Sequence, residues 1–308
     1  MTTPQPKVSI VIPVYDEEEN VVSLVERVDA AMEGQGRPWE TIVVDDGSRD
    51  GTLKKLLPLR ASHPTLRLVR MRRNYGQTLA MQAGIDAARG RVVVTLDGDL
   101  QNDPADIPKL LAKLEEGWDV VSGWRRRRKD NALLRTLPSR IANRIIGALS
   151  GVHLHDTGCS LKAYRLEPLR RVRLYADMHR FIPAIISASG ARITEIEVSH
   201  HPRRAGRSKY GLSRIYRVLL DLVVIQMITG FVARPGAWFS LMGWPWFLLA
   251  TVLLWCGRGD ASDSIVLPAS AFLCFFLGIH FLVLSLVGEL ALASGTYHPE
   301  TMVEEEEL

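Results

Sequence analysis

Two long uncharged runs in the last third of the chain restrict its possible folds more than any other feature. Residues 235–257 hold no charged side chain over 23 positions, and in the 25 residues of 264–288 only His280 is basic or acidic. About 20 apolar residues cross the hydrocarbon core of a bilayer as a helix. Because six residues separate the runs, they predict a hairpin of two transmembrane helices, at about 235–257 and 264–288.

The charges around this hairpin predict its orientation. The loop between the runs carries one arginine and two aspartates, whereas the segment before them carries Arg203, Arg204, Arg207, Lys209, Arg214 and Arg217. By the positive-inside rule, the large N-terminal part and the acidic tail then face the cytoplasm. The N-terminus lacks a signal-peptide pattern, and three scattered cysteines suit a reducing compartment. We therefore expect a multi-pass protein of the inner cell membrane with its catalytic domain in the cytoplasm.

Short segments rich in Val and Ile alternate with helical segments before the membrane runs. The expected strands are residues 8–15, 41–46, 66–71, 91–97 and 119–124, and the expected helices are 17–32, 52–59, 77–88 and 104–116. This alternation predicts an α/β fold with a Rossmann-like, mainly parallel, doubly wound sheet. Sheets of this kind bind ligands at the carboxyl ends of their strands.

The charge balance indicates an anionic partner. Net charge is +4, and because Glu304 to Glu307 contribute −4, the rest of the chain carries +8. A basic domain suits an anionic ligand, an anionic membrane surface or nucleic acid. The chain has no P-loop motif, and no Gly-x-Gly-x-x-Gly follows its first expected strand, which excludes these two nucleotide-binding classes.

Three segments with carboxylates fall at the ends of expected strands: Pro13 to Glu17, Asp45 to Thr52, and VTLDGDLQNDP at 94–104. Each alone has ordinary turn and helix-capping chemistry, but together, at one edge of a sheet, they predict a polar site. In the third segment the polar residues alternate, so an extended chain would point Asp97, Asp99 and Gln101 to one side. Mg²⁺ or Mn²⁺ prefers such oxygen ligands and often shares them with a substrate diphosphate.

Six motifs follow one another along the chain: IPVYDEEEN, VVDDGSRDGT, Asn74 to Gly76, LDGDLQNDP, DTGCSLKAYR and HHPRRAGRSKYG. From about Lys7 to Glu289 the chain thereby resembles the family 2 glycosyltransferases with a GT-A fold. More narrowly, it resembles their polyprenyl-phosphate branch, which includes dolichol-phosphate mannose synthases and bacterial undecaprenyl-phosphate sugar transferases. The resemblance implies inverting transfer of one sugar from a UDP- or GDP-linked nucleotide-diphosphate sugar to an undecaprenyl- or dolichyl-type polyprenyl phosphate.

The resemblance also implies roles for individual residues. The nucleotide-sugar would be bound by Pro13, Tyr15, Glu17, Asp45, Asp46, Asp97 and Lys162, and the Mg²⁺ or Mn²⁺ ion by Asp97, Asp99 and Gln101. Asp99 and Asp156 would be catalytic; for Asp156, which opens DTGCSLKAYR, a turn residue beside Gly158 is the alternative. Some relatives carry an acidic residue where this chain has Cys159, and Lys162 replaces a common arginine, which loosens its expected contact with donor phosphate.

Polar residues directly before the membrane runs are candidates for binding the acceptor phosphate. They are Arg204, Arg207, Ser208 and Lys209, to which the resemblance adds Arg180. The alternative for the basic ones is a juxtamembrane patch that attracts anionic lipid. For Arg125 to Lys129 we expect a solvated or membrane-facing loop rather than a catalytic element. His179 matches the acceptor-side segment, with a helix-start contact as the alternative.

The expected organisation is a cytoplasmic catalytic domain at 1–211, interfacial helices at 212–234, the hairpin within 235–289 and an acidic cytoplasmic tail at 290–308. Enzymes of this branch are often tetramers, so a homo-oligomer is a candidate state; no nucleic-acid partner is expected. Two other classes stay open: a membrane-anchored transferase with a soluble or other lipid acceptor, and a nucleotide-binding scaffold that has lost catalysis. The intact acidic motifs count against the scaffold.

Overall fold

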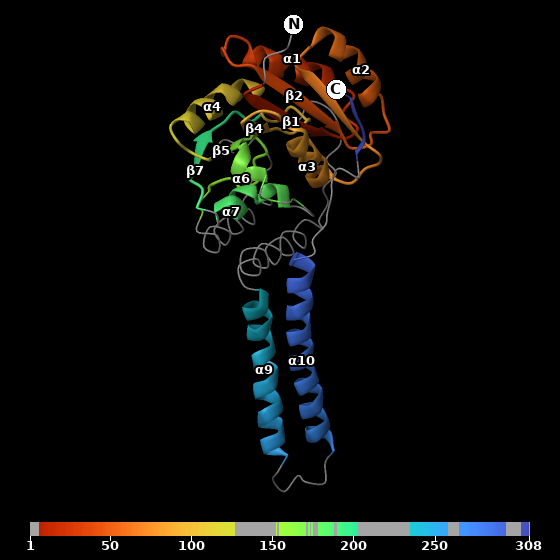
Figure 1. Ribbon diagram of the computed structural model, residues 1–308, viewed down its shortest axis with the longest axis vertical. Helices are drawn as coiled ribbons and strands as arrows, with labels where there is room; N and C mark the ends of the chain where they lie inside the picture. Colours follow the sequence, from red (N-terminus) through yellow and green to blue (C-terminus); the bar gives the residue numbers. More distant parts are fainter. Residues whose placement is uncertain are drawn as a thin grey trace. The chain divides into compact units, whose positions relative to one another are not determined.

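The computed structural model describes residues 6–126, 152, 154–170, 172, 174, 178–187, 190–202, 235–257, 265–293 and 303–307. The chain divides into two compact units, Met1–Leu222 with His298–Leu308, and Val223–Tyr297. The first holds a sheet with its helices and the second holds two long helices (Figure 1). The expected interfacial helices at 212–234 lie outside the described residues, so the expected domain boundaries stay a prediction.

The described strands form one sheet in the order β7-β5-β6-β4-β1-β2-β3-β8. Their bounds are β1 Val8–Val14, β2 Trp39–Asp45, β3 Leu66–Met71, β4 Val92–Thr95, β5 Val120–Trp124, β6 Lys162–Arg165, β7 Ile193–Glu197 and β8 Val303–Glu307. β1 pairs parallel with β2 and β4, β2 with β3, and β5 with β7. β6 is antiparallel to both β4 and β5. The expected mainly parallel α/β sheet is confirmed, although a short antiparallel strand from the KAYR segment separates β4 from β5.

The helices of the first unit are α1 Val21–Met32, α2 Thr52–Ser62, α3 Gln77–Ala87, η1 Pro104–Asp106, α4 Ile107–Glu115, α6 Leu166–Arg170, η2 Met178–Arg180 and α7 Ile182–Ser187. Three of the four expected helices differ, and the first is α2, which continues past Pro58 to Ser62 instead of ending at residue 59. The helix expected from residue 17 starts later, because the carbonyl of Glu17 accepts the N–H groups of Asn20 and Val21 in a turn. The helix expected at 104–116 divides into η1 and α4, and the side chain of Asp103 caps η1 by accepting the N–H of Ala105.

Helices cover both faces of the sheet, which explains why every residue of β1 is buried. Ile10 and Ile12 belong to one core cluster with Leu24 and Val28 of α1 and with the apolar stripe of α4. On the other face α3 comes so close that a Cβ on Gly84 would lie 2.4 Å from Cγ1 of Val11. Apolar burial at roughly 1.5–3 kcal/mol per large side chain holds these layers together and leaves the strand ends for the site.

The second unit consists of α9 Pro235–Cys256 and α10 Val266–Ala293. Their windows Phe239–Cys256 and Val266–Gly288 have mean hydropathies of 1.6 and 2.4, yet only 11% and 17% of these windows is buried. Large apolar side chains such as Leu241 and Leu273 are more than two-thirds exposed, at 72% and 73%. A core helix of a soluble protein would hide these side chains, whereas a bilayer would solvate them. Length, composition and exposure therefore agree with two membrane spans.

Small residues let α9 and α10 pack closely. A Cβ on Gly278 would lie 2.7 Å from the ring of Phe247, and a Cβ on Gly243 would lie 3.3 Å from the carbonyl oxygen of Gly278. Because lipid tails are as apolar as these side chains, close packing at small residues is what holds helices together in a membrane.

Candidate active site

Six strand ends meet at one edge of the sheet. β1, β2 and β4 are parallel, with Asp45 opposite Val14 and Thr95 opposite Val11. β6 begins at this edge, where Lys162 lies opposite both Thr95 and Ser122. β5 and β7, antiparallel to β6, therefore also end here. All three carboxylate-bearing segments predicted from the sequence reach this edge.

The first two segments are tied to each other by hydrogen bonds. Asp16, in the left-handed region at φ +51°, donates its N–H to Ser48 and accepts the N–H of Arg49. The N–H of Glu17 donates to the hydroxyl of Thr52 at 2.9 Å, and the carboxylate of Glu17 accepts from Asn20 at 2.6 Å. The loop after β1, which holds Tyr15 and Glu17, is thus fixed to the loop after β2.

Asp46 fixes a third loop, the one that carries Asn74 to Gly76. Its two carboxylate oxygens accept the N–H groups of Tyr75 and Gly76 at 2.8 and 2.9 Å. Burial raises the pKa of Asp46, and these two hydrogen bonds act against that shift. Gly47 has φ +68°, and a Cβ there would lie 2.5 Å from the carbonyl carbon of Arg73, so only glycine allows the two loops this close. Asp45 is likewise buried and accepts the N–H of Ser48.

The predicted metal ligands lie directly after β4. The chain is not extended here, as the alternation argument assumed, because Leu100 adopts φ +56° and the carboxylate of Asp99 accepts the N–H of Gln101 at 3.1 Å. Asp97 accepts a 2.6 Å hydrogen bond from the side chain of Gln77 at the start of α3. Burial first, and then the charge of Asp99, raise the pKa of Asp97, while a hydrogen bond from Ser160 and then the charges of Arg125 and Arg180 lower it to a smaller degree.

The carboxylates of Asp97 and Asp99 suit a bound cation, because they are close enough to repel each other and burial limits their hydration. Among the described residues no three His, Cys, Asp or Glu side chains group as metal ligands. Mg²⁺ and similar hard ions are commonly held by only one or two carboxylates, with water and substrate phosphates completing the shell. The donor set of Asp97 and Asp99 therefore suits a cation that is bound together with a diphosphate.

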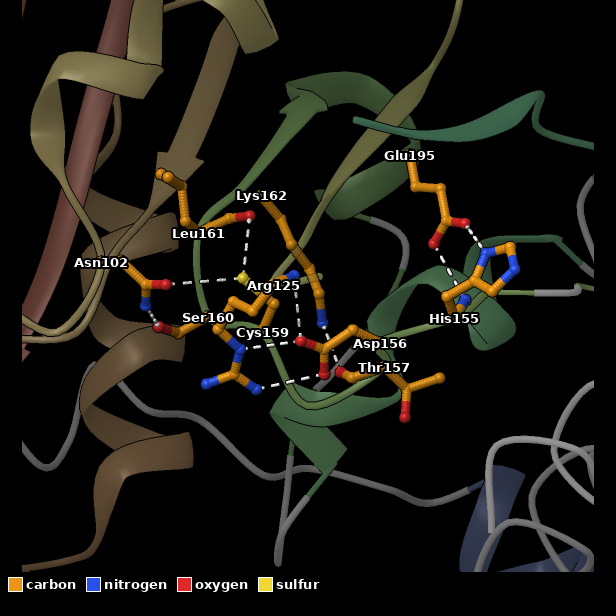
Figure 2. Close-up of polar contacts among 10 residues, drawn as sticks. All are labelled: Asn102, Arg125, His155, Asp156, Thr157, Cys159, Ser160, Leu161, Lys162 and Glu195. Atoms are coloured by element: carbon orange, nitrogen blue, oxygen red, sulfur yellow. Dashed lines mark hydrogen bonds and ion pairs between the residues drawn. The ribbon is translucent and has the colours of Figure 1, made fainter. Parts of the chain in front are cut away.

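Arg125 corrects the expectation of a solvated loop at 125–129. Its guanidinium donates from Nε and Nη2 to the two carboxylate oxygens of Asp156, at 2.7 and 3.1 Å (Figure 2). Side-chain exposure is 14% for Arg125 and 3% for Asp156. Burial disfavours the guanidinium charge, but the hydrogen bonds and attraction of Asp156 outweigh it and raise the pKa of Arg125 above its usual value. Arg126 is exposed as expected, and residues 127–129 lie outside the described residues.

The start of β6 brings a buried lysine and a buried cysteine to this pair (Figure 2). Nζ of Lys162 donates to the carbonyls of Thr157 and Arg180 at 3.0 and 3.3 Å. Burial lowers the pKa of Lys162 to about 8, so it is still mostly protonated at neutral pH but loses its proton at a lower pH than an ordinary lysine. Burial also raises the pKa of Cys159 to about 11, and its Sγ contacts Oδ1 of Asn102 at 3.6 Å. The position at which some relatives carry an acid thus holds a thiol that stays protonated.

His179 and Arg180 lie in η2, which contacts Lys162 through the carbonyl of Arg180. Nδ1 of His179 is 2.6 Å from the hydroxyl of Thr78 on α3. Burial, with help from Arg180 and Lys162, lowers the pKa of His179 to about 3, which keeps the imidazole neutral. His179 therefore connects η2 to the helix whose first residue, Gln77, contacts Asp97.

The structure brings together the predicted residues from Pro13 to Arg180 and adds Gln77 and Arg125, which sequence reasoning missed. Gln77 belongs to no motif, and Arg125 is the first of four consecutive arginines that read as a surface run. Asp103, the third aspartate of LDGDLQNDP, instead pairs with Arg27 and His201. Arg204, Arg207, Ser208 and Lys209 lie outside the described residues.

Comparison with known proteins gives concordant matches. The family model described as Glycosyl transferase family 2 matches residues 9–173. A dodecaprenyl-phosphate galacturonate synthase from Rhizobium johnstonii is 48% identical over 252 residues, covering 80% of this chain and 75% of that protein. An undecaprenyl-phosphate 4-deoxy-4-formamido-L-arabinose transferase from Shewanella sediminis is 36% identical over 293 residues, covering 92% and 86%.

Solved structures match at the level of the fold. Glucosyl-3-phosphoglycerate synthase from Mycobacterium tuberculosis, in complex with Mn²⁺, UDP and glucosyl-3-phosphoglycerate, aligns with a TM-score of 0.55 at 18% identity. The alignment covers 73% of this chain and 80% of that one. The same enzyme with phosphoglyceric acid aligns with a TM-score of 0.56 at 19% identity.

Proposed function

The chain belongs to glycosyl transferase family 2, and from that premise we propose that it transfers one sugar, with inversion, from a nucleotide-diphosphate sugar to a polyprenyl phosphate. The expected family and GT-A-like fold are thereby confirmed. The single observation that carries the proposal is the placement of Asp97 and Asp99 beside Arg125 and Arg180 at the carboxyl edge of the sheet. Carboxylates for a cation next to guanidinium groups for phosphates are what a reaction between two phosphorylated substrates requires.

For the donor we assign Pro13, Tyr15, Glu17, Asp45 and Asp46 to the nucleoside. They are supported by their place on the first two loops of the edge, whose backbone is fixed by side-chain hydrogen bonds. Lys162 is assigned to the sugar diphosphate, to which it could deliver its third N–H. A preorganised loop binds without losing further conformational freedom, which favours a flexible nucleotide ligand.

A divalent cation, Mg²⁺ or Mn²⁺, is assigned to Asp97, Asp99 and Gln101, where it would stabilise the leaving nucleoside diphosphate as a Lewis acid. Gln77 holds Asp97 in place through its 2.6 Å hydrogen bond.

The acceptor needs orientation more than it needs a strong base. A polyprenyl phosphate is already largely anionic near neutral pH, since its second pKa is about 6. We propose that Asp156 acts through Arg125, holding the guanidinium so that Nη1, which makes no hydrogen bond among the described residues, faces the reacting phosphate. Arg180 and the segment with Arg204, Arg207, Ser208 and Lys209 would bind the same phosphate by charge-assisted hydrogen bonds.

We further propose that both the catalytic unit and the tail are cytoplasmic at the inner membrane. The two apolar helices agree with membrane association. β8 follows α10 in the chain and yet pairs with β3, so the chain crosses an even number of times between them. The many basic residues before α9 favour the cytoplasmic side for both ends.

The experiment that tests this function is a transfer assay with the full chain in uncharged detergent. Polyprenyl phosphate is offered with UDP- and GDP-linked sugars, with Mg²⁺ or Mn²⁺. Nucleotide-linked galacturonic acid comes first, because a 48% identical relative is named for galacturonate. We expect one sugar per lipid phosphate and an equal amount of nucleoside diphosphate. Transfer only to soluble acceptors would support the anchored-transferase alternative, and donor binding without any transfer would support a scaffold.

A further inference from the structure

Five side chains close in sequence or space to the Arg125–Asp156 pair contact one another in a row, which we call the ladder. It consists of Glu195 and Glu197 on β7, Trp124 at the end of β5, and Arg126 and His155. The rings of Trp124 and His155 stack with centroids 4.3 Å apart at 19°, and the guanidinium of Arg126 lies 5.8 Å from the Trp124 ring. Arg126 pairs with Glu197 at 2.7 Å, and His155 pairs with Glu195.

Two members of the ladder are the sequence neighbours of the Arg125–Asp156 ion pair. Arg126 follows Arg125, and His155 precedes Asp156. Glu195 contacts His155 with both carboxylate oxygens. Oε2 accepts the backbone N–H of His155 at 2.9 Å, and Oε1 contacts Nδ1 of its ring (Figure 2). A bond to the backbone restricts where the chain enters Asp156, whatever the side chain of residue 155 does.

We propose that Glu195 is a positioning residue, which fixes the backbone at His155 so that the carboxylate of Asp156 meets Arg125 with bidentate geometry. This rests on the proposed transferase function, in which that pair orients the reacting phosphate. A displacement of about 1 Å in a group that orients a reactant can cost roughly 100-fold in rate. Glu195 therefore acts on turnover without touching a substrate.

Glu197 provides a matched control on the same strand and the same face. Both glutamates bind a residue adjacent to the ion pair, and both partners are exposed, at 66% for His155 and 64% for Arg126. Glu195 itself is only 16% exposed and bonds to backbone, whereas Glu197 is 53% exposed and, within the part of the chain that the structure describes, its carboxylate pairs with the side chain of Arg126. Exposed pairs of the second kind contribute little.

The test compares Glu195→Ala, Glu195→Gln and Glu197→Ala in the full chain, using the transfer assay. A lost hydrogen bond to a carboxylate corresponds to a roughly 10-fold or greater effect. We expect Glu195→Ala to lower kcat by about 10-fold while KM for the donor changes little, and to lower the melting temperature modestly because a hydrogen bond to a largely buried carboxylate is lost. Glu195→Gln keeps a carbonyl oxygen for the His155 N–H and should recover most of kcat. Glu197→Ala should match the wild type.

Three results would overturn the positioning role. An unchanged kcat in Glu195→Ala would show that Glu195 has no positioning role. A rise in KM with kcat unchanged would mean that the ladder binds substrate, and equal loss in Glu195→Ala and Glu197→Ala would mean that the strand is only structural. The proposed function is judged separately by transfer in the wild type, so its failure cannot be mistaken for failure of this inference.

Discussion

The surroundings of Asp97 disfavour the charged form of its carboxylate. Burial and the nearby Asp99 raise its pKa, and the compensating influence of a Ser160 hydrogen bond and of the charges on Arg125 and Arg180 is smaller. A bound cation would offset both the burial of Asp97 and its repulsion by Asp99. Asp97 and Asp99 therefore suit a metal site better than a purely structural loop. The neighbouring Asp103 shows the structural alternative, because it caps η1 and pairs with Arg27.

At this scale we predict that Asp99→Ala abolishes transfer. Loss of a Lewis acid removes several kcal/mol of charge stabilisation, on the order of 1000-fold in rate. Transfer is measured with and without EDTA, followed by added Mg²⁺ or Mn²⁺. Asp103→Asn serves as the control from the same stretch and should retain transfer, at some cost in stability. A wild-type rate in EDTA would falsify the metal assignment.

His179 gives a pH prediction. Its native pKa is lowered from 6.5 to about 3, so between these values the unfolded chain binds a proton that the native imidazole does not. The free energy of unfolding therefore falls as pH falls through this window, by at most about 1.4 kcal/mol per pH unit. We expect the melting temperature to drop between pH 7 and 5, and to drop less in His179→Gln, which can still bond to Thr78. Equal drops in both proteins would contradict this origin.

Among the elements, β8 changes the view of the acidic tail. The sequence indicated a tail of unassigned role, whereas residues 303–307 add an antiparallel strand, with Arg70 opposite Glu305 and Val69 opposite Glu306. Consecutive glutamates are poor strand formers, so local propensity does not explain the pairing. The edge of β3 explains the pairing, since an unpaired strand edge offers a row of backbone donors and acceptors.

We predict that deleting residues 303–308 speeds amide hydrogen exchange in residues 68–71 of β3. The cause is loss of the neighbouring backbone partners. Hydrogen exchange read by mass spectrometry compares the deletion with a chain in which Glu304 to Glu307 are glutamines. Because glutamine keeps the backbone, the second chain should retain more protection than the deletion. Unchanged exchange in both would show that β8 does not cover this edge in solution.

For the whole molecule, the proposed topology places the catalytic unit and the tail on the same side of the membrane. A protease added to sealed inside-out vesicles should cut the catalytic unit and the tail together. Right-side-out vesicles, which hide the cytoplasmic face, are the control and should protect both. Protection of only one of the two in inside-out vesicles is incompatible with a two-span hairpin. An epitope after residue 308 and antibodies to the catalytic unit report the two ends.

The sequence by itself determined the family, the alternation of strands and helices, and the two apolar spans. Each depends on information that is local in the chain: motif spacing, hydrophobic periodicity and the length of an uncharged run. The comparisons and the fold bear these out. The placement of Asp45, Asp46 and Asp97 at one edge also followed, since the carboxyl ends of parallel strands must meet.

Only the tertiary structure decided which groups neutralise which charges. Arg125 read as part of a surface run, yet β6 inserts between β4 and β5 and brings Asp156 to it across 31 positions of chain. Asp97, Asp99 and Gln101 read as one extended row, yet the left-handed Leu100 turns the chain. The acidic tail had no assigned role, yet β8 within it pairs with β3. For Arg125 and for β3 the partner is distant in sequence, and burial or pairing makes that partner more important than local preference, because an unpaired charge or backbone group is costly away from water.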